Sequence, residues 1–239
     1  MTGTSVIAKT TLLRFGAQLS EKALHYAGGL FDYVELGWWL RTHGFRDGIR
    51  VRSPHEIFER IAAEVADQRV HYVQFGAVDP AIVRYWSQHR NGNSSFQVFA
   101  PAHDRSTDWI PGRGGGHKWS RRVAAARGAG PQSNGAIARD DRLVDHAVGD
   151  FESLFAAYDW PPFDTLIAVF DTDFYPTTKS ALDFIGEKLS VGSFLFFDQL
   201  NHCADELRAL DEFLRETRMS FELFAAVREL SVAAFRRTG

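Results

Sequence analysis

The chain has very little cysteine and no long hydrophobic run. Its single cysteine, Cys203, excludes an intramolecular disulfide framework and a multi-cysteine zinc site. No stretch of about 20 consecutive apolar residues occurs, and Lys9 and Arg14 are not followed by the apolar core and small-residue cleavage site of a secretory leader. We therefore expect a soluble, cytoplasmic protein that does not associate with membranes.

The chain also lacks an excess of charge of one sign. It has 27 basic and 30 acidic residues, with a net charge of −3, so it has no general attraction for nucleic acid or for anionic membranes. A small molecule is the expected partner. The 239 residues, of which 45% are hydrophobic, are enough for one domain with a large buried core.

Short apolar segments recur along the chain with helical stretches between them. They lie at residues 72–75, 96–99, 143–148, 165–170 and 193–197. This alternation predicts an α/β fold, with a mostly parallel sheet covered by helices on both faces. After a helix at 204–217, segments 220–225 and 230–235 predict a terminal antiparallel hairpin.

The first part of the chain has apolar residues at helical spacing. We predict an N-terminal helical extension over residues 1–67, followed by the α/β domain over 68–239, the two forming a single globular unit. Ser53, Pro54 and Glu56 predict a helix start, with Ser53 as the N-cap.

The N-terminal extension is rich in aromatic residues, among them Phe31, Trp38, Trp39 and Phe45. Two interpretations are equally compatible with this pattern. The N-terminal helices form a homodimer surface, or their aromatic side chains pack within the monomer.

Candidate ligand-binding residues lie at the ends of three of the predicted strands, where a doubly wound sheet binds its ligands. The candidates after the first strand are Gln74, Gly76, Val78 and Asp79; those after the later strands are Asp171 with Asp173, and Asp198 with Gln199. Asp171, Asp198 and Gln199 together offer oxygen ligands that suit Mg²⁺. The alternative is that each aspartate caps the following helix.

Two further features bear on catalysis. His202 follows Asp198 closely and is the best histidine candidate for a general base, although a surface histidine is the ordinary alternative. Residues 101–141 form a long segment without clean periodicity, which is typical of a mobile lid over a site or of a flexible insertion.

An ordered set of motifs in this chain resembles the macrocin O-methyltransferase family of class I S-adenosylmethionine-dependent methyltransferases. The set comprises Tyr72-Val-Gln-Phe-Gly76, Arg84-Tyr-Trp-Ser87, Asp140-Asp-Arg-Leu143, Phe170-Asp-Thr-Asp-Phe-Tyr-Pro-Thr-Thr178, Phe197-Asp-Gln-Leu-Asn201 and Val232-Ala-Ala-Phe235. The resemblance covers roughly residues 68–237. It implies a Rossmann-like, seven-stranded sheet with an antiparallel last strand.

The resemblance also implies a cofactor and a reaction. S-adenosylmethionine would contact Gln74, Gly76, Val78, Asp79, Ala100 and Asp171. Asp171 and Asp198 would correspond to ligands of a divalent metal such as Mg²⁺, with Gln199 as a neutral third ligand, and Asp171 would also be a candidate base. The reaction is then methyl transfer to the hydroxyl group of a small molecule.

The cofactor side departs from the family pattern at four positions. Gln74 and Asp79 replace the two glutamates of the opening motif, Pro80 replaces its last glycine, and Ala100 stands where an acidic residue normally accepts hydrogen bonds from the ribose. Leaving those ribose contacts unmade would cost about 1–3 kcal/mol of binding free energy. A second hypothesis is therefore a catalytically degenerate methyltransferase fold that acts as a binding, scaffold or repurposed subunit.

Overall fold

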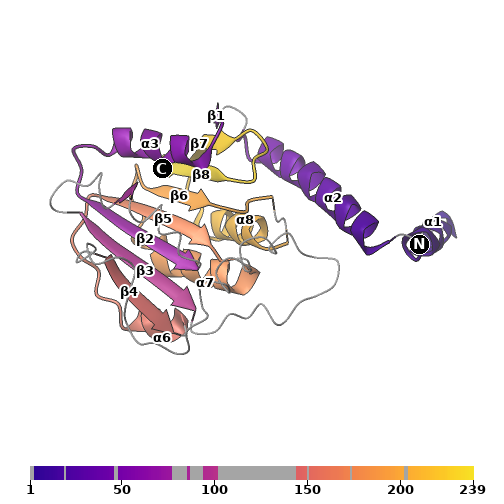
Figure 1. The fold of residues 1–239 in the computed structure, drawn as a ribbon, viewed down its shortest axis with the longest axis horizontal. Coiled ribbons are helices and arrows are strands. Elements are labelled where there is room, and N and C mark those ends of the chain that lie inside the picture. Colours follow the sequence, from indigo (N-terminus) through magenta and orange to yellow (C-terminus); the bar gives the residue numbers. More distant parts are fainter. Residues whose placement is uncertain are drawn as a thin grey trace.

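A computed structural model describes residues 3–18, 20–45, 48–76, 85–86, 94–101, 144–149, 151–172, 174–201 and 204–239. Its centre is one sheet in which eight strands are ordered β1-β7-β8-β6-β5-β2-β3-β4 (Figure 1). Strand β8 runs antiparallel to both of its neighbours, and every other pairing between neighbouring strands is parallel.

The predicted fold class is confirmed, with one addition. The five predicted strands correspond to β2 (Val70–Gly76), β3 (Ser95–Pro101), β4 (Val144–Gly149), β5 (Thr165–Asp171) and β6 (Phe194–Phe197). The predicted terminal hairpin is β7 (Phe221–Val227) with β8 (Ala233–Arg237). A short strand that the sequence analysis did not predict, β1 (Ile49–Val51), pairs in parallel with β7 and adds an eighth strand to the seven expected.

Helices cover both faces of the sheet. One face packs against the end of α2 (Glu21–Thr42) and against α6 (Phe151–Ala156), α7 (Tyr175–Gly186) and α8 (Glu206–Thr217). The other face packs against α3 (Pro54–Glu64), together with Tyr85 and Trp86. The described side chains of β2, β5 and β6 are almost all buried, which explains why these strands read as continuous apolar runs.

Helix α3 begins where the sequence predicted. Ser53 is its N-cap residue and Pro54 lies in the first turn, but the Ser53 side chain makes no capping hydrogen bond. The stability of α3 comes from packing instead, because Ile57, Phe58 and Ile61 are buried against the sheet. Strand β1 and helix α3 thus pack with the α/β body, although they precede the predicted domain boundary at residue 67, which stays a prediction.

The N-terminal helices form an arm that leaves the body (Figure 1). Helix α1 (Gly3–Gly16) and most of α2 project outward, and α2 is joined to the body at its carboxyl end. The four aromatic residues singled out in the sequence divide accordingly. Trp39 and Phe45 are buried in the core, whereas Trp38 and Phe31 are exposed.

Among the helices of the described part of the chain, none combines the length and the apolar character that crossing a membrane requires.

Candidate functional site

The candidate site lies at the carboxyl ends of the central parallel strands. After β2 the chain continues to β3 and β4 on one side, and it then returns to β5 on the other side of β2. The boundary between β2 and β5 is therefore the point at which the strand order reverses. In open α/β sheets this is where ligands bind.

Gly76 is the last residue of β2 and lies at this boundary. It is paired with Asp171 in the sheet register, and its φ angle is +97°. A Cβ atom on Gly76 would lie 1.8 Å from the backbone oxygen of Asp171 and 3.0 Å from the Cα of Thr172. Only glycine combines this left-handed backbone with so close an approach of two chain segments.

Asp171 and Asp198 occupy neighbouring positions at the same edge. Phe170 of β5 is in register with Phe197 of β6, and the Asp198 backbone N–H donates a hydrogen bond of 3.1 Å to the Phe170 oxygen. The residues that follow the two phenylalanines are Asp171 and Asp198, so their backbones end side by side. Both side chains are partly exposed.

The loop after β6 is held by two acidic residues that the sequence analysis did not single out. The carboxylate of Glu206, which is fully buried at the start of α8, accepts a hydrogen bond of 3.1 Å from the Gln199 backbone N–H. Asp205 accepts one of 3.2 Å from the Tyr175 backbone N–H, at the start of α7. These bonds fix the loop that carries Asp198 and Gln199 against both helices.

The turn after β5 is held by hydroxyl groups. The Oγ1 atoms of Thr172 and Thr178 are 2.5 Å apart, and Thr178 also donates to the Phe174 carbonyl at 3.0 Å. Both threonines are buried. Part of the motif at residues 170–178 therefore shapes the turn itself, independently of any ligand.

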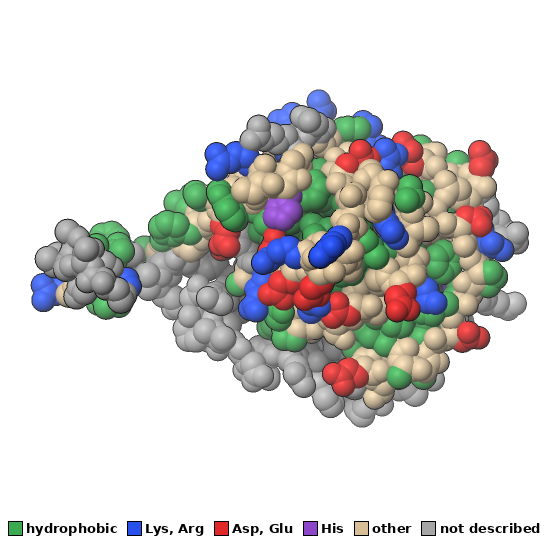
Figure 2. All heavy atoms as spheres, turned by 180° about the vertical axis from the view of Figure 1, so that it is seen from behind, with side chains coloured by type: hydrophobic (Ala, Val, Ile, Leu, Met, Phe, Trp, Pro, Cys, Tyr) green, Lys and Arg blue, Asp and Glu red, His purple; other side chains and the backbone are tan. Residues whose placement is uncertain are grey.

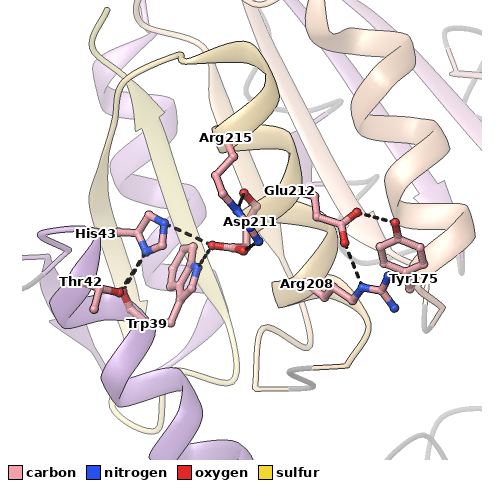
Figure 3. A network of polar contacts seen from close by, with 8 residues as sticks. All are labelled: Trp39, Thr42, His43, Tyr175, Arg208, Asp211, Glu212 and Arg215. Carbon is pink, nitrogen blue, oxygen red and sulfur yellow. Dashed lines mark hydrogen bonds and ion pairs between the residues drawn. The ribbon is translucent and has the colours of Figure 1, made fainter.

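A charged cluster joins α7 to α8 close to this turn (Figure 3). The Tyr175 hydroxyl donates to Glu212, Arg208 Nε donates to Glu212 at 3.0 Å, and the Arg208 guanidinium lies 4.0 Å from the centre of the Tyr175 ring. The hydrogen bond between Tyr175 and Glu212 raises the pKa of the tyrosine hydroxyl and lowers that of the carboxyl. The cluster fixes how the two helices that follow β5 and β6 pack together.

The other predicted cofactor contacts in the described region are Gln74 and Ala100. The Gln74 side chain is buried, and its Oε1 accepts a hydrogen bond of 2.9 Å from the Tyr72 hydroxyl. Ala100 lies beside Val148 in the pairing of β3 with β4, at the same end of the sheet, and is partly exposed. Gln74 thus has a structural role in the core, and a cofactor contact at either residue stays a prediction.

Several predicted features lie outside the described residues. They are Val78, Asp79, Pro80, Asp173, His202, Cys203 and nearly all of the segment 101–141. Within the described part of the chain, no three or more histidine, cysteine, aspartate or glutamate residues are grouped as a metal site would need. The predicted Mg²⁺ ligands there are two aspartates and one glutamine.

Solved structures of several methyltransferases are similar to this chain. CalS11, a calicheamicin methyltransferase, matches with a TM-score of 0.50 and 18% identity over 77% of this chain and 80% of its own. The O-methyltransferase NovP matches with a TM-score of 0.48 and 20% identity over 77% of this chain and 79% of its own. TomG from Streptomyces achromogenes, an O-methyltransferase solved with SAM, matches with a TM-score of 0.44 and 13% identity over 87% and 90%.

No protein-family model and no curated protein sequence matches this chain. The likeness to CalS11 establishes a Rossmann-like fold of the methyltransferase type. The particular resemblance to the macrocin O-methyltransferases is not confirmed by these comparisons.

Proposed function

We propose that this protein is an S-adenosylmethionine-dependent O-methyltransferase that acts on a hydroxyl group of a small molecule. The observation that supports this most is the meeting of Gly76 and Asp171 at the point where the strand order reverses. A methyltransferase-type sheet, a glycine turn and a carboxylate then coincide at one edge. Gly76, Val78, Asp79 and Ala100 belong to the proposed cofactor side.

The reaction assigns a role to each group. The acceptor oxygen attacks the methyl carbon of the sulfonium, the carbon–sulfur bond breaks, and its electron pair stays on sulfur, giving S-adenosylhomocysteine. Asp171 takes the hydroxyl proton, with His202 as the second candidate base. Most of the rate enhancement would come from aligning the acceptor oxygen with the methyl group.

A divalent metal is the finer part of this proposal. Asp171 and Asp198 end neighbouring strands, and Mg²⁺ in proteins is commonly held by one or two carboxylates together with water. The Gln199 side chain would supply a neutral third ligand. A cation bound there would stabilise the alkoxide that forms as the acceptor loses its proton.

A second candidate function is binding without methyl transfer. Two observations favour it. The Gln74 side-chain oxygen accepts a hydrogen bond from the Tyr72 hydroxyl within the core, and the Ala100 side chain has no group that could hydrogen-bond a ribose. In that case the fold would serve as a scaffold or a repurposed subunit. The two candidates differ in their affinity for the cofactor.

Calorimetric titration with S-adenosylmethionine, with and without Mg²⁺, separates them. Under the methyltransferase proposal the native protein binds with a micromolar Kd. Ala100→Asp, which restores a ribose acceptor, should tighten binding by about tenfold, the lower end of what such contacts contribute. Ala157→Asp is the matched control, because it adds the same charge at an exposed position next to α6.

Two results would reject methyl transfer: no heat of binding, and no thermal shift at millimolar cofactor. If Ala157→Asp raised the affinity for S-adenosylmethionine as much as Ala100→Asp does, position 100 would not be part of the cofactor site. Asp198→Ala should abolish any stimulation of turnover by Mg²⁺, and unchanged turnover would remove the metal from the mechanism.

A further inference from the structure

The projecting helix α2 carries a row of exposed apolar side chains. Tyr26, Leu30, Val34 and Trp38 are spaced by four residues, so they follow one side of the helix, and their exposed fractions are 67%, 68%, 70% and 58%. We call these four residues the α2 stripe. Figure 2 shows apolar side chains along the arm, away from the body.

The stripe faces away from the side by which α2 joins the body. Leu36, Trp39 and Leu40 are buried in the core, and they lie about 120–160° around the helix from Val34, at about 100° per residue. Polar contacts fix this orientation (Figure 3): Asp211 of α8 accepts a hydrogen bond of 2.8 Å from Trp39 Nε1, and His43 Nε2 lies 3.2 Å from the same oxygen. The contacts that anchor the helix therefore leave the stripe uncovered.

The exposed apolar area is of the size that protein interfaces use. Phe31 and Tyr33 flank the stripe and are also exposed. A large aromatic side chain has about 150–250 Å² of surface, and the aliphatic Leu30 and Val34 have somewhat less, so at the observed exposures the six side chains expose roughly 700 Å². A stable dimer buries about 800 Å² per partner, whereas scattered apolar residues on a monomer rarely form so large a patch.

We propose that the α2 stripe binds the α2 stripe of a second copy of this chain, with the two helices antiparallel about a two-fold axis. The spacing of the stripe is symmetric about Asp32, so an antiparallel pair places Tyr26 opposite the partner's Trp38 and Leu30 opposite the partner's Val34. The same patch then serves both subunits, as a closed two-fold dimer requires.

The charges on α2 favour a second copy over a membrane surface. Its acidic residues are Glu21, Asp32 and Glu35, and its basic residues are Lys22 and Arg41. Helices that bind anionic membranes are rich in lysine and arginine on the polar side, which α2 is not. Two such nearly neutral helices approach each other with little electrostatic repulsion.

Sedimentation velocity from 1 to 100 µM tests the dimer directly. The native chain should reach twice its mass of 26.9 kDa. Leu30→Lys, at the centre of the stripe, should raise the dimer Kd at least a hundredfold. Glu35→Lys is the matched control, because it places a lysine at an exposed position of the same helix outside the stripe, and it should leave the Kd within about threefold.

Cysteine crosslinking tests the antiparallel register in the Cys203→Ser background. Tyr26→Cys combined with Trp38→Cys should form a covalent dimer on oxidation, since the paired Cα atoms would lie within disulfide reach of about 7 Å. Tyr26→Cys alone should not, because antiparallel packing separates the two copies of residue 26 by about 18 Å along the helix. A parallel pair would instead crosslink in both variants, because the two copies of position 26 would then lie side by side.

Several outcomes would overturn the proposal. The first is a native chain that stays monomeric at 100 µM, and the second is a Leu30→Lys dimer of unchanged affinity. The third is crosslinking of the single Tyr26→Cys variant. A fourth is a monomer that sediments with phosphatidylcholine and phosphatidylserine vesicles and loses this binding in Leu30→Lys, which would assign the stripe to a membrane surface.

Discussion

At the scale of single residues, Gly76 is the position of the candidate site that tolerates substitution least. Its φ angle of +97° disfavours any side chain, and a Cβ would overlap the backbone oxygen of Asp171. Since that oxygen belongs to the main chain of β5, it cannot move aside as the end of a flexible side chain would. Relief requires that β2 and β5 separate at the edge where the ligand site lies.

We therefore predict that Gly76→Ala lowers the free energy of unfolding by about 3 kcal/mol or more, through backbone strain plus the steric overlap. Gly192→Ala is the matched control, because Gly192 has a φ angle of +92° but no atom within 4 Å of the position of a Cβ. It should cost only about 1–2 kcal/mol. Urea denaturation measures both, and equal losses would show that the approach to Asp171 is not what requires glycine.

The buried side chain of His71 makes the stability of the fold depend on pH. Its ring is buried, contacts Ser95 Oγ at 2.8 Å and the Tyr158 hydroxyl at 3.0 Å, and stacks against Phe163. Burial lowers its pKa to about 4, and a hydrogen bond with the Ser95 backbone only partly opposes this. The folded state therefore prefers the neutral ring, whereas the unfolded chain protonates at a pKa of about 6.5.

The contribution of His71 to stability is thus fully present above pH 6.5 and is lost as the pH falls toward 4. We predict a loss of about 3 kcal/mol between pH 7 and pH 4 from this group. In His71→Gln the decline over that range should be smaller by a similar amount, as measured by urea denaturation at several pH values. His55→Gln, at an exposed histidine, should decline as the native protein does, and an unchanged slope in His71→Gln would exclude His71 as the cause.

Some residues of the candidate site could be identified from their neighbours in the sequence, and others could not. Gly76 and Asp171 could be singled out because each directly follows a run of apolar residues, which fixes its place at the end of a strand. Glu206 could not, because its burial depends on the loop after β6 folding back over α8. The acidic pair Asp205-Glu206 at the start of an amphipathic helix was the available signal, but it is equally typical of an exposed helix start.

At the scale of elements, the sequence predicts what is local and misses what needs a distant partner. Strands β2, β3, β5 and β6 are apolar runs between turns, so their type follows from the residues alone. Strand β1 has only three residues, of which Ile49 and Arg50 are exposed and Val51 is buried. Its pairing with β7 joins segments far apart in the chain, and three residues do not show a period.

Two adjacent residues near the carboxyl end of α2 show the same limit. Trp38 and Trp39 are adjacent and chemically identical, yet one is exposed and the other is buried against Phe45 and Phe235. Aromatic content therefore could not decide between packing in the monomer and a dimer surface. The structure assigns Trp39 to the core, and exposure makes Trp38 available for association.

At the scale of the whole molecule, the arm and the body have separate roles in stability. All residues between 3 and 34 whose exposure is described are exposed or partly exposed. In contrast, Leu36, Trp39, Leu40 and Phe45 are buried in the core on the α8 side of the sheet. The boundary between arm and body therefore falls near residue 35, inside a single helix. The sequence could not show this, because the periodicity of α2 does not change there.

This boundary predicts the outcome of two truncations. A variant lacking residues 1–34 should keep its free energy of unfolding within about 1 kcal/mol of the full chain, because it loses little buried surface. A variant lacking residues 1–47 also loses four large buried side chains, each worth about 2–5 kcal/mol, which together approach the whole stability of a typical domain. It should fail to fold.

Circular dichroism and urea denaturation at about 1 µM distinguish these outcomes, since working at low concentration limits any contribution from association to the stability of the full chain. If removal of residues 1–34 unfolded the protein, the arm would have to stabilise the body through contacts beyond those at the end of α2. If removal of residues 1–47 left a cooperative, equally stable protein, the burial of Trp39 and Phe45 would be incidental. The expected pattern, one truncation tolerated and the other not, requires that the core of this fold begin within α2.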